Sequence, residues 1–192
     1  VTLQADDVMT LTGAVSTNSI STTVGLNTGA VTITAIGASE LTADVKNGTL
    51  NYTSTGATTI NQVTGGTGSV TINAPSVNDH ASDTIADITA DTVSITGTSG
   101  IGNSAPVDIA SAAGITLIAT SGNIDVDHVA DASTTVSNVQ TGSGTVTFDQ
   151  TGNQALGITI ASTTDGTITV NNTEGTLTLG DLTAGGSGDL AL

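Results

Sequence analysis

Acidic residues and histidines cluster at two places where they could bind a divalent cation. The first cluster, in NIDVDHVAD, contains Asp125, Asp127, His128 and Asp131. Asp125 and Asp127 are two positions apart, so on a strand they share one face at a separation of roughly 7 Å, too wide to chelate one ion without help from neighbouring ligands. A solvated acidic strand edge is the alternative and more ordinary interpretation of this cluster.

The second cluster contains Asp79, His80 and Asp83, within the irregular stretch NAPSVNDHASD at 73–83. This stretch has a proline, small residues and no apolar alternation, so we expect a loop that protrudes from the fold. A flexible loop can gather ligands around a cation, although nothing in the sequence fixes their geometry. Binding of a divalent cation or another ligand through 73–83 is therefore one hypothesis for function.

Catalytic groups are scarce in this chain. It has one Lys+Arg in total, and its only aromatic residues are Tyr52 and Phe148. Polysaccharide-cleaving enzymes on β-helical folds need basic residues or paired carboxylates beside sugar-stacking aromatics, and a Ser-His-Asp triad would have to use His80 or His128. Lys46 could cross-link to an asparagine, but a solvated lysine is far commoner. We predict that the protein is not an enzyme, and we assign it no metal, cofactor or catalytic residue.

Threonines offer a different kind of binding surface. Thr145 and Thr147 recur in the next repeat as Thr167 and Thr169, and the two pairs would stack one coil apart in outward rows similar to those of ice-binding proteins. The flanking coils break the array, with Asn123 and Asp125 before it and Asp189 and Ala191 after it, and threonine is a favoured outward residue on any strand. An ice-binding threonine face stays an alternative.

The charge of the chain limits its partners. Its formal net charge is −16, from 17 Asp+Glu against one Lys+Arg. Nucleic acid is excluded as a partner because binding phosphates requires cationic side chains, and no apolar run is long enough to insert into a membrane. Cysteine is absent, so the fold uses no disulfides or thiolate ligands. Three N-glycosylation sequons occur, at Asn47, Asn51 and Asn171. Chance explains most of them in a chain this rich in Asn and Thr, but they would be decorated surface positions if the source glycosylates.

The elements that would position these residues repeat at a fixed period. In the C-terminal half, glycine recurs at a constant interval of 22, at Gly100, Gly122, Gly144, Gly166 and Gly188. Upstream, the intervals are 19 and 20, at Gly29, Gly48 and Gly68. Apolar alternations such as TVTF at 145–148 and TITV at 167–170 follow most of these glycines. Self-similarity at this period is typical of a solenoid, in which each repeat is one turn of the chain.

The composition of the repeat identifies the kind of solenoid. Runs of alternating β-branched residues favour strands over disorder, and they exclude a helical repeat. Strands this short cannot bury an apolar face alone, so successive coils must stack, with glycines at the corners. We predict an all-β protein, a parallel β-solenoid (right-handed β-helix, the default for parallel crossovers) with about 19–22 residues per coil and about nine coils. A second strand in each coil is expected at 134–139, 156–160 and 176–182.

Residues 1–192 are expected to form a single solenoid block. Neither end shows the polar cap that a solenoid needs, since an open coil is an unpaired sheet edge. We therefore expect either a segment of a longer fibrous protein or a subunit that polymerises. Self-association, end to end or laterally into filaments, is the predicted partner interaction.

Several phrases in residues 89–192 carry a family resemblance: GIGNSAPVDI, TSGNIDV and GTLTLGDLTAGGSGDLAL. This region resembles the repeat regions of large secreted bacterial adhesins of the filamentous haemagglutinin type. The resemblance implies a β-helical shaft at the cell surface that holds a receptor-binding tip away from the cell, with no catalytic residue in the shaft. The first hypothesis for function is thus an extracellular fibre or adhesin shaft, the second a binding module and the third an enzyme.

Overall fold

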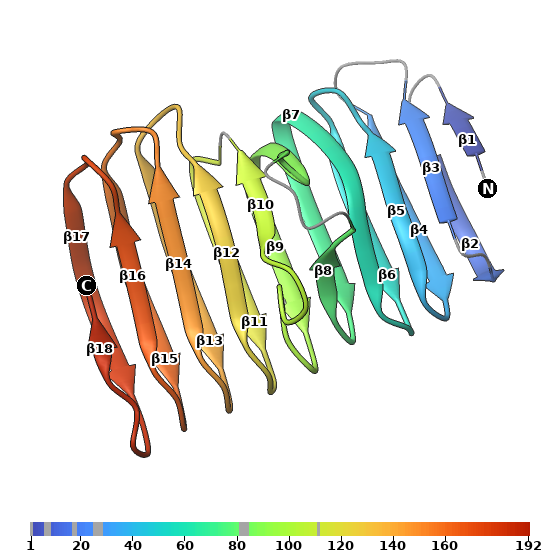
Figure 1. Ribbon diagram of the computed structural model, residues 1–192. Coiled ribbons are helices and arrows are strands. Elements are labelled where there is room, and N and C mark those ends of the chain that lie inside the picture. The colour runs from blue at the N-terminus through green and yellow to red at the C-terminus, as the bar shows by residue number, and fades with distance from the viewer. Residues whose placement is uncertain (1, 6–8, 17–18, 25–28, 81–84, 111) are drawn as a thin grey trace.

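The computed structural model describes residues 2–5, 9–16, 19–24, 29–80, 85–110 and 112–192. These residues form 18 strands in one continuous sheet, in which every strand pairing is parallel (Figure 1). They contain no helix, and hence no helix that is long and apolar enough to cross a membrane. The prediction of an all-β, parallel β-solenoid is therefore confirmed.

The sheet winds into two columns of strands that face each other across a narrow core (Figure 1). The first column contains β1 (Thr2–Ala5), β3 (Ser19–Val24), β5 (Ser39–Asp44), the first part of β7 (Thr58–Ala74), β8 (Val77–Asp79), the first part of β9 (Ile88–Gly97), β10 (Val107–Ala110), β12 (Ile124–Val129), β14 (Val146–Thr151), β16 (Ile168–Asn172) and β18 (Leu190–Ala191). The second column contains β2 (Met9–Ser16), β4 (Ala30–Ile36), β6 (Thr49–Ser54), the later parts of β7 and β9, β11 (Gly114–Ala119), β13 (Thr134–Thr141), β15 (Leu156–Thr163) and β17 (Leu177–Ala184). Two strands, β7 and β9, run round a corner and belong to both columns. The number of strands is therefore not a direct count of turns, and the predicted count of about nine coils is only approximate.

Successive coils pair at intervals that match the sequence period. Ile124 pairs with Val146, which pairs with Ile168, and both steps equal the interval of the glycine series. Nearer the N-terminus the interval is shorter, as between Val31 and Leu50. The predicted second strand of each coil is also confirmed, as β13, β15 and β17. Each strand thus finds its partners one turn of the chain before and after itself.

Alternation along each strand builds a continuous apolar core. In β14, Val146 and Phe148 are buried, whereas Thr147 and Asp149 between and after them face outward. Tyr52 is also fully buried, and its hydroxyl lies within hydrogen-bond distance of the Ser39 hydroxyl. The core is otherwise made of aliphatic side chains, which suits the short distance between the two columns.

Glycines line up along the corners because each corner lies directly on the backbone of the coil before it. A Cβ atom on Gly144 would lie 2.4 Å from the carbonyl oxygen of Gly122, and one on Gly166 would lie 1.9 Å from that of Gly144. The same close approach recurs upstream in the series Gly29, Gly48 and Gly68. The predicted stacking of these glycines is confirmed.

The prediction of a protruding loop over 73–83 is wrong for most of that range. Asn73 and Ala74 belong to β7, and Val77–Asp79 forms β8, which pairs with the start of β7. Val77, Asn78 and Asp79 are all buried, directly after a corner at Pro75. Asp83 lies outside the described residues.

The extra length of this coil lies after β8. Asp79 pairs with Ile60 and Ile88 with Val63, so nine positions on this coil correspond to three on the coil before. The next coil has a shorter insertion of the same kind, and we call these two inserted stretches the excursions. Ile101 and Val107 pair with Ile124 and Val126, so six positions there correspond to two. Two stacked excursions therefore interrupt the first column between β8 and β10.

Candidate functional site

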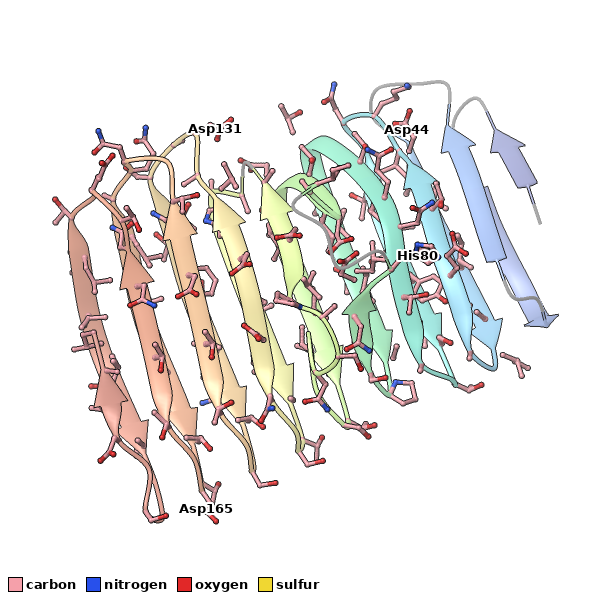
Figure 2. All side chains as sticks on the ribbon, in the orientation of Figure 1. Asp44, His80, Asp131 and Asp165 are labelled. Carbon is pink, nitrogen blue, oxygen red and sulfur yellow. The ribbon has the colours of Figure 1, made fainter. Side chains whose placement is uncertain are left out.

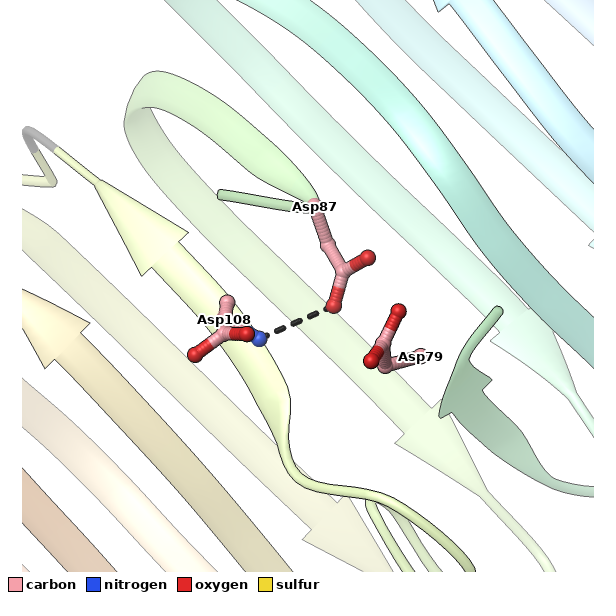
Figure 3. A group of neighbouring side chains, drawn as sticks. All are labelled: Asp79, Asp87 and Asp108. Atoms are coloured by element: carbon pink, nitrogen blue, oxygen red, sulfur yellow. Dashed lines mark hydrogen bonds between the residues drawn. The ribbon is translucent and has the colours of Figure 1, made fainter. Parts of the chain in front are cut away.

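The two excursions bring three carboxylates together on the first column (Figure 3). Asp79 ends β8, Asp87 comes just before β9, and Asp108 lies in β10. One carboxylate oxygen from each residue lies within 4.8 Å of the other two. We call these three residues the aspartate triad.

The carboxyl groups of the triad are held by hydrogen bonds, and two of them are buried. The backbone N–H of Asp108 donates to the Asp87 carboxylate at 2.9 Å. Asp79 and Asp87 are 7% and 2% exposed, so both carboxyl groups are largely removed from water. Burial raises the pKa of Asp87 to about 8, opposed by the hydrogen bond from Asp108 and reinforced by a hydrogen bond and negative charge from Asp79. Asp87 therefore keeps its proton at neutral pH and can donate it to Asp79.

This arrangement can do one of two things chemically. It can hold a proton between Asp87 and Asp79, which relieves the repulsion of neighbouring carboxylates. It can also hold a divalent cation, because carboxylate oxygens at this spacing are hard ligands of the kind that Ca²⁺ prefers. Binding of a cation would require Asp87 to release its proton, so the two states compete.

Of the second predicted cluster, only Asp79 belongs to the triad. His80 is exposed (Figure 2), and its Nε2 atom lies 3.6 Å from a carboxylate oxygen of Glu40. Sequence reasoning missed Asp87 and Asp108, because they are separated from Asp79 by excursions of irregular length. A signal was present for Asp108, which lies one coil before Asp127 and pairs with it.

The first predicted cluster is divided between two sides of a strand. Asp125 and Asp127 face outward on β12, whereas His128 points inward and is 1% exposed. Asp131 is exposed in the corner that follows (Figure 2). Among the residues that the structure describes, only the aspartate triad brings three potential metal ligands within 4.8 Å of one another, so these four residues do not converge on one point.

Outward carboxylates form a row along the first column instead. Asp108 pairs with Asp127, Asp127 with Asp149, and Asp149 with Asn171, whose side-chain amide donates to the Asp149 carboxylate. Burial, followed by the charge of Asp149, raises the pKa of Asp127. Burial and then the charges of Asp127 and Asp149 likewise raise the pKa of Asp125. The row concentrates negative charge on one side of the molecule.

A second row of polar side chains lies on the inner side of three of these four strands. His128 Nδ1 lies 3.0 Å from Gln150 Oε1, and Gln150 Nε2 donates to Asn172 at 3.2 Å. These residues are in register on β12, β14 and β16. The Nε2 atom of His128 is buried without a hydrogen-bond partner, and burial lowers the pKa of this imidazole despite its bond to Gln150. The row favours a neutral histidine and fixes the register of the coils.

A groove of about 780 Å³ lies at the C-terminal end of the first column. Asp127, Asp149 and Asn171 line one part of it, and Leu177 and Leu192 line another. The leucines belong to the last coil, where Leu192 is 65% exposed. The groove thus joins the row of carboxylates to the apolar end of the core.

The remaining sequence candidates stay apart from one another. Thr147 pairs with Thr169, but Asp125 precedes this pair and Ala191 follows it, so the ordered threonine array is two coils long. Thr145 and Thr167 precede β14 and β16 at the corners. Lys46 forms an exposed ion pair with Asp44 at 2.6 Å. The sequon residues Asn47, Asn51 and Asn171 are all exposed.

Comparison of the chain with protein-family models, curated proteins and solved structures found no match. Its function must therefore be argued from the fold and from the chemistry of its surfaces.

Proposed function

We propose that this chain is a structural segment of an extracellular bacterial fibre or adhesin shaft of the filamentous haemagglutinin type. The observation that carries the proposal is the parallel stacking of 18 strands, in one sheet, over one aliphatic core. Such a stack resists bending because every coil is hydrogen-bonded to two others along its strands. Its role would be to place a binding region at a distance from the cell, without catalysis.

The surface is suited to this role outside the cell. A net charge of −16 keeps rods soluble and apart, while Thr, Ser and Asn cover most of the outward strand positions. The partly exposed leucines of β17 and β18 would favour end-to-end association with a further coil. Association into filaments, end to end or laterally, is part of the proposal.

Antibodies raised against this chain test the proposal on intact cells of the organism that produces it. We expect immunogold label on thin projections outside the cell envelope. Scattering from the purified chain should fit an elongated particle on the order of 40 Å long, given about 4.8 Å per coil. Label that appears only after the cells are permeabilised would contradict an extracellular shaft.

The second candidate function is binding of a divalent cation, and the geometry of the aspartate triad favours it. Its three carboxylate oxygens lie within 4.8 Å of one another, and two of the residues are buried. Oxygen ligands in this number are a partial coordination sphere for Ca²⁺, which takes six to eight. A bound cation would join β8, β9 and β10 where the excursions interrupt the column.

Calorimetric titration with CaCl₂ tests this second function. A cation site should give saturable heat. The affinity for Ca²⁺ should increase from pH 6 to pH 8, because the proton on Asp87 competes with the metal. Asp108→Asn should abolish this heat, whereas Asp165→Asn, in a distant corner, should preserve it (Figure 2). Absence of saturable heat at both pH values would reject cation binding and leave the shaft proposal unaffected.

A further inference from the structure

The two columns differ sharply in charge. The first column carries Glu40, Asp44, Asp79 and the row of carboxylates from Asp108 to Asp149. The strand segments of the second column from β4 to β15, which for β9 means 92–97, contain no Asp, Glu, Lys, Arg or His. Charge returns to this column only at Asp181 in β17. The negative charge of the described structure is therefore confined to one face, the corners and the last coil.

The outward residues of β4, β6, β11, β13, β15 and the later parts of β7 and β9 form what we call the uncharged face. Two rows of side chains run along it in register from β4 to β11. One row contains Thr32, Asn51, Thr71, Ser94 and Thr116. The other contains Thr34, Thr53, Asn73, Thr96 and Ile118. No register shift interrupts either row between these strands, so both rows repeat regularly at the spacing of the strands.

We propose that the uncharged face is the surface through which two copies of this chain associate side by side. A copy with 16 net negative charges approaches another with least repulsion where neither presents a carboxylate. The ridges of one face also match the grooves of another, because both copies repeat at the same strand spacing. A surface that complements itself in this way is suited to a two-fold dimer.

The area and composition of the uncharged face support a second copy of the chain as its partner. Seven strands about 4.8 Å apart and about six residues long give a face of roughly 35 Å by 20 Å. Two such faces would bury about 1,400 Å², within the range of about 1,200–2,000 Å² for stable interfaces. Outward isoleucines add apolar contact: Ile36 is 44% exposed, and Ile118 and Ile160 are partly exposed. Threonine methyl groups between them can interdigitate as in a dry strand-to-strand interface.

This inference deepens the proposed function by naming the face and the partner of lateral association, and it rests on that function only for its biological setting. A lateral dimer is a closed species, whereas stacking of coil ends gives an open series of oligomers, so the two modes of association are distinguishable. Loss of the dimer would leave the shaft proposal intact, and failure of surface labelling would leave the dimer intact.

Sedimentation of the purified full chain, from micromolar to millimolar concentration, tests the proposal. We expect a monomer–dimer equilibrium that tightens with added NaCl, since salt screens the repulsion between acidic copies. Thr96→Lys, at the centre of the uncharged face, should weaken dimerisation by about tenfold or more by placing two like charges against each other. Thr169→Lys is the matched control, because it makes the same exchange at an outward strand position on the acidic column, and it should leave the equilibrium unchanged.

Three results would overturn the inference. A monomer at every concentration and salt would exclude the dimer. Equal dimerisation of wild type and Thr96→Lys, with native circular dichroism in both, would place the interface elsewhere. A monomer that shows thermal hysteresis, abolished by Thr96→Lys, would assign the face to ice instead of a second copy.

Discussion

Gly144→Ala is expected to destabilise the protein by about 3 kcal/mol or more, which corresponds to a fall in Tm of about 10 °C for a chain of this size. Gly144 has a φ of +125°, in a region that residues with a Cβ atom rarely adopt. The added methyl group would also lie 2.4 Å from the Gly122 oxygen, which is backbone and cannot move aside alone. To admit it, the coils must separate and weaken the hydrogen bonds between them.

Two other alanine substitutions separate the collision from the backbone strain. Gly37→Ala has a φ of +86° but no atom within 4 Å of the new Cβ, so it should cost about 1 kcal/mol, from strain alone. Gly157 has no positive φ, and a Cβ atom there would have its nearest contact at 3.8 Å. The free energy of unfolding of Gly157→Ala should therefore stay within about 0.5 kcal/mol of the wild-type value. Thermal melts followed by circular dichroism provide the measurement. Equal effects at all three positions would contradict close stacking at the corners.

In buffer that contains a chelator, we expect the free energy of unfolding to fall by several kcal/mol between about pH 4 and pH 8. The pKa of Asp87 is about 8 in the folded protein, against an ordinary value of 3.8 for an aspartate in the unfolded chain. Between these values the folded state holds a proton that the unfolded state has released, so raising the pH favours unfolding. Below this interval both states are protonated, and above it both are ionised, so the effect levels off at each end. Each tenfold difference in proton affinity corresponds to about 1.4 kcal/mol.

Asp87→Asn should remove most of this pH dependence. An asparagine amide can donate to Asp79 as the protonated acid does, and its oxygen can accept from the Asp108 N–H, but it never ionises. The variant should therefore be more stable than wild type at pH 8 and similar to it near pH 4. A smaller pH dependence should remain, in which the raised pKa values of Asp125 and Asp127 lower the stability as the pH rises and the lowered pKa of His128 acts in the opposite direction.

Urea unfolding at a series of pH values measures both curves. Asp165→Asn is the control, since it removes one carboxylate from an exposed corner, and it should retain the wild-type slope. If Asp87→Asn is instead less stable than wild type at pH 8, the buried carboxyl group makes contacts that an amide cannot replace, and the assignment of the proton to Asp87 fails.

The fold could be predicted from the sequence because its period is marked by the corner glycines, which a residue with a Cβ atom could not replace. The stacking of Gly122, Gly144 and Gly166 follows from their spacing, since each corner must pass directly over the one before it. Strand direction and pairing then follow from the alternation, which fixes which side chains enter the core. The irregular stretch at 73–83 misleads because a corner at Pro75 and a short buried strand resemble a loop in composition.

The candidate site was less predictable, because it depends on where the period fails. Asp79, Asp87 and Asp108 meet only because two excursions of unequal length stack on each other, and neither length can be inferred from the repeat. His128 shows the opposite case. Residue type groups it with Asp125 and Asp127, although alternation along one strand turns its side chain into the core. Alternation is the better guide where the strand is regular.

The pairing of each strand with partners only one turn away along the chain also constrains how the protein can reach its native state. No contact has to wait for a distant part of the sequence, so ordering can begin in one coil and spread to its neighbours in succession. A chain threaded through a narrow pore could then gain structure turn by turn as it emerges. Each newly ordered turn would serve as the template for the next and would hinder backward movement.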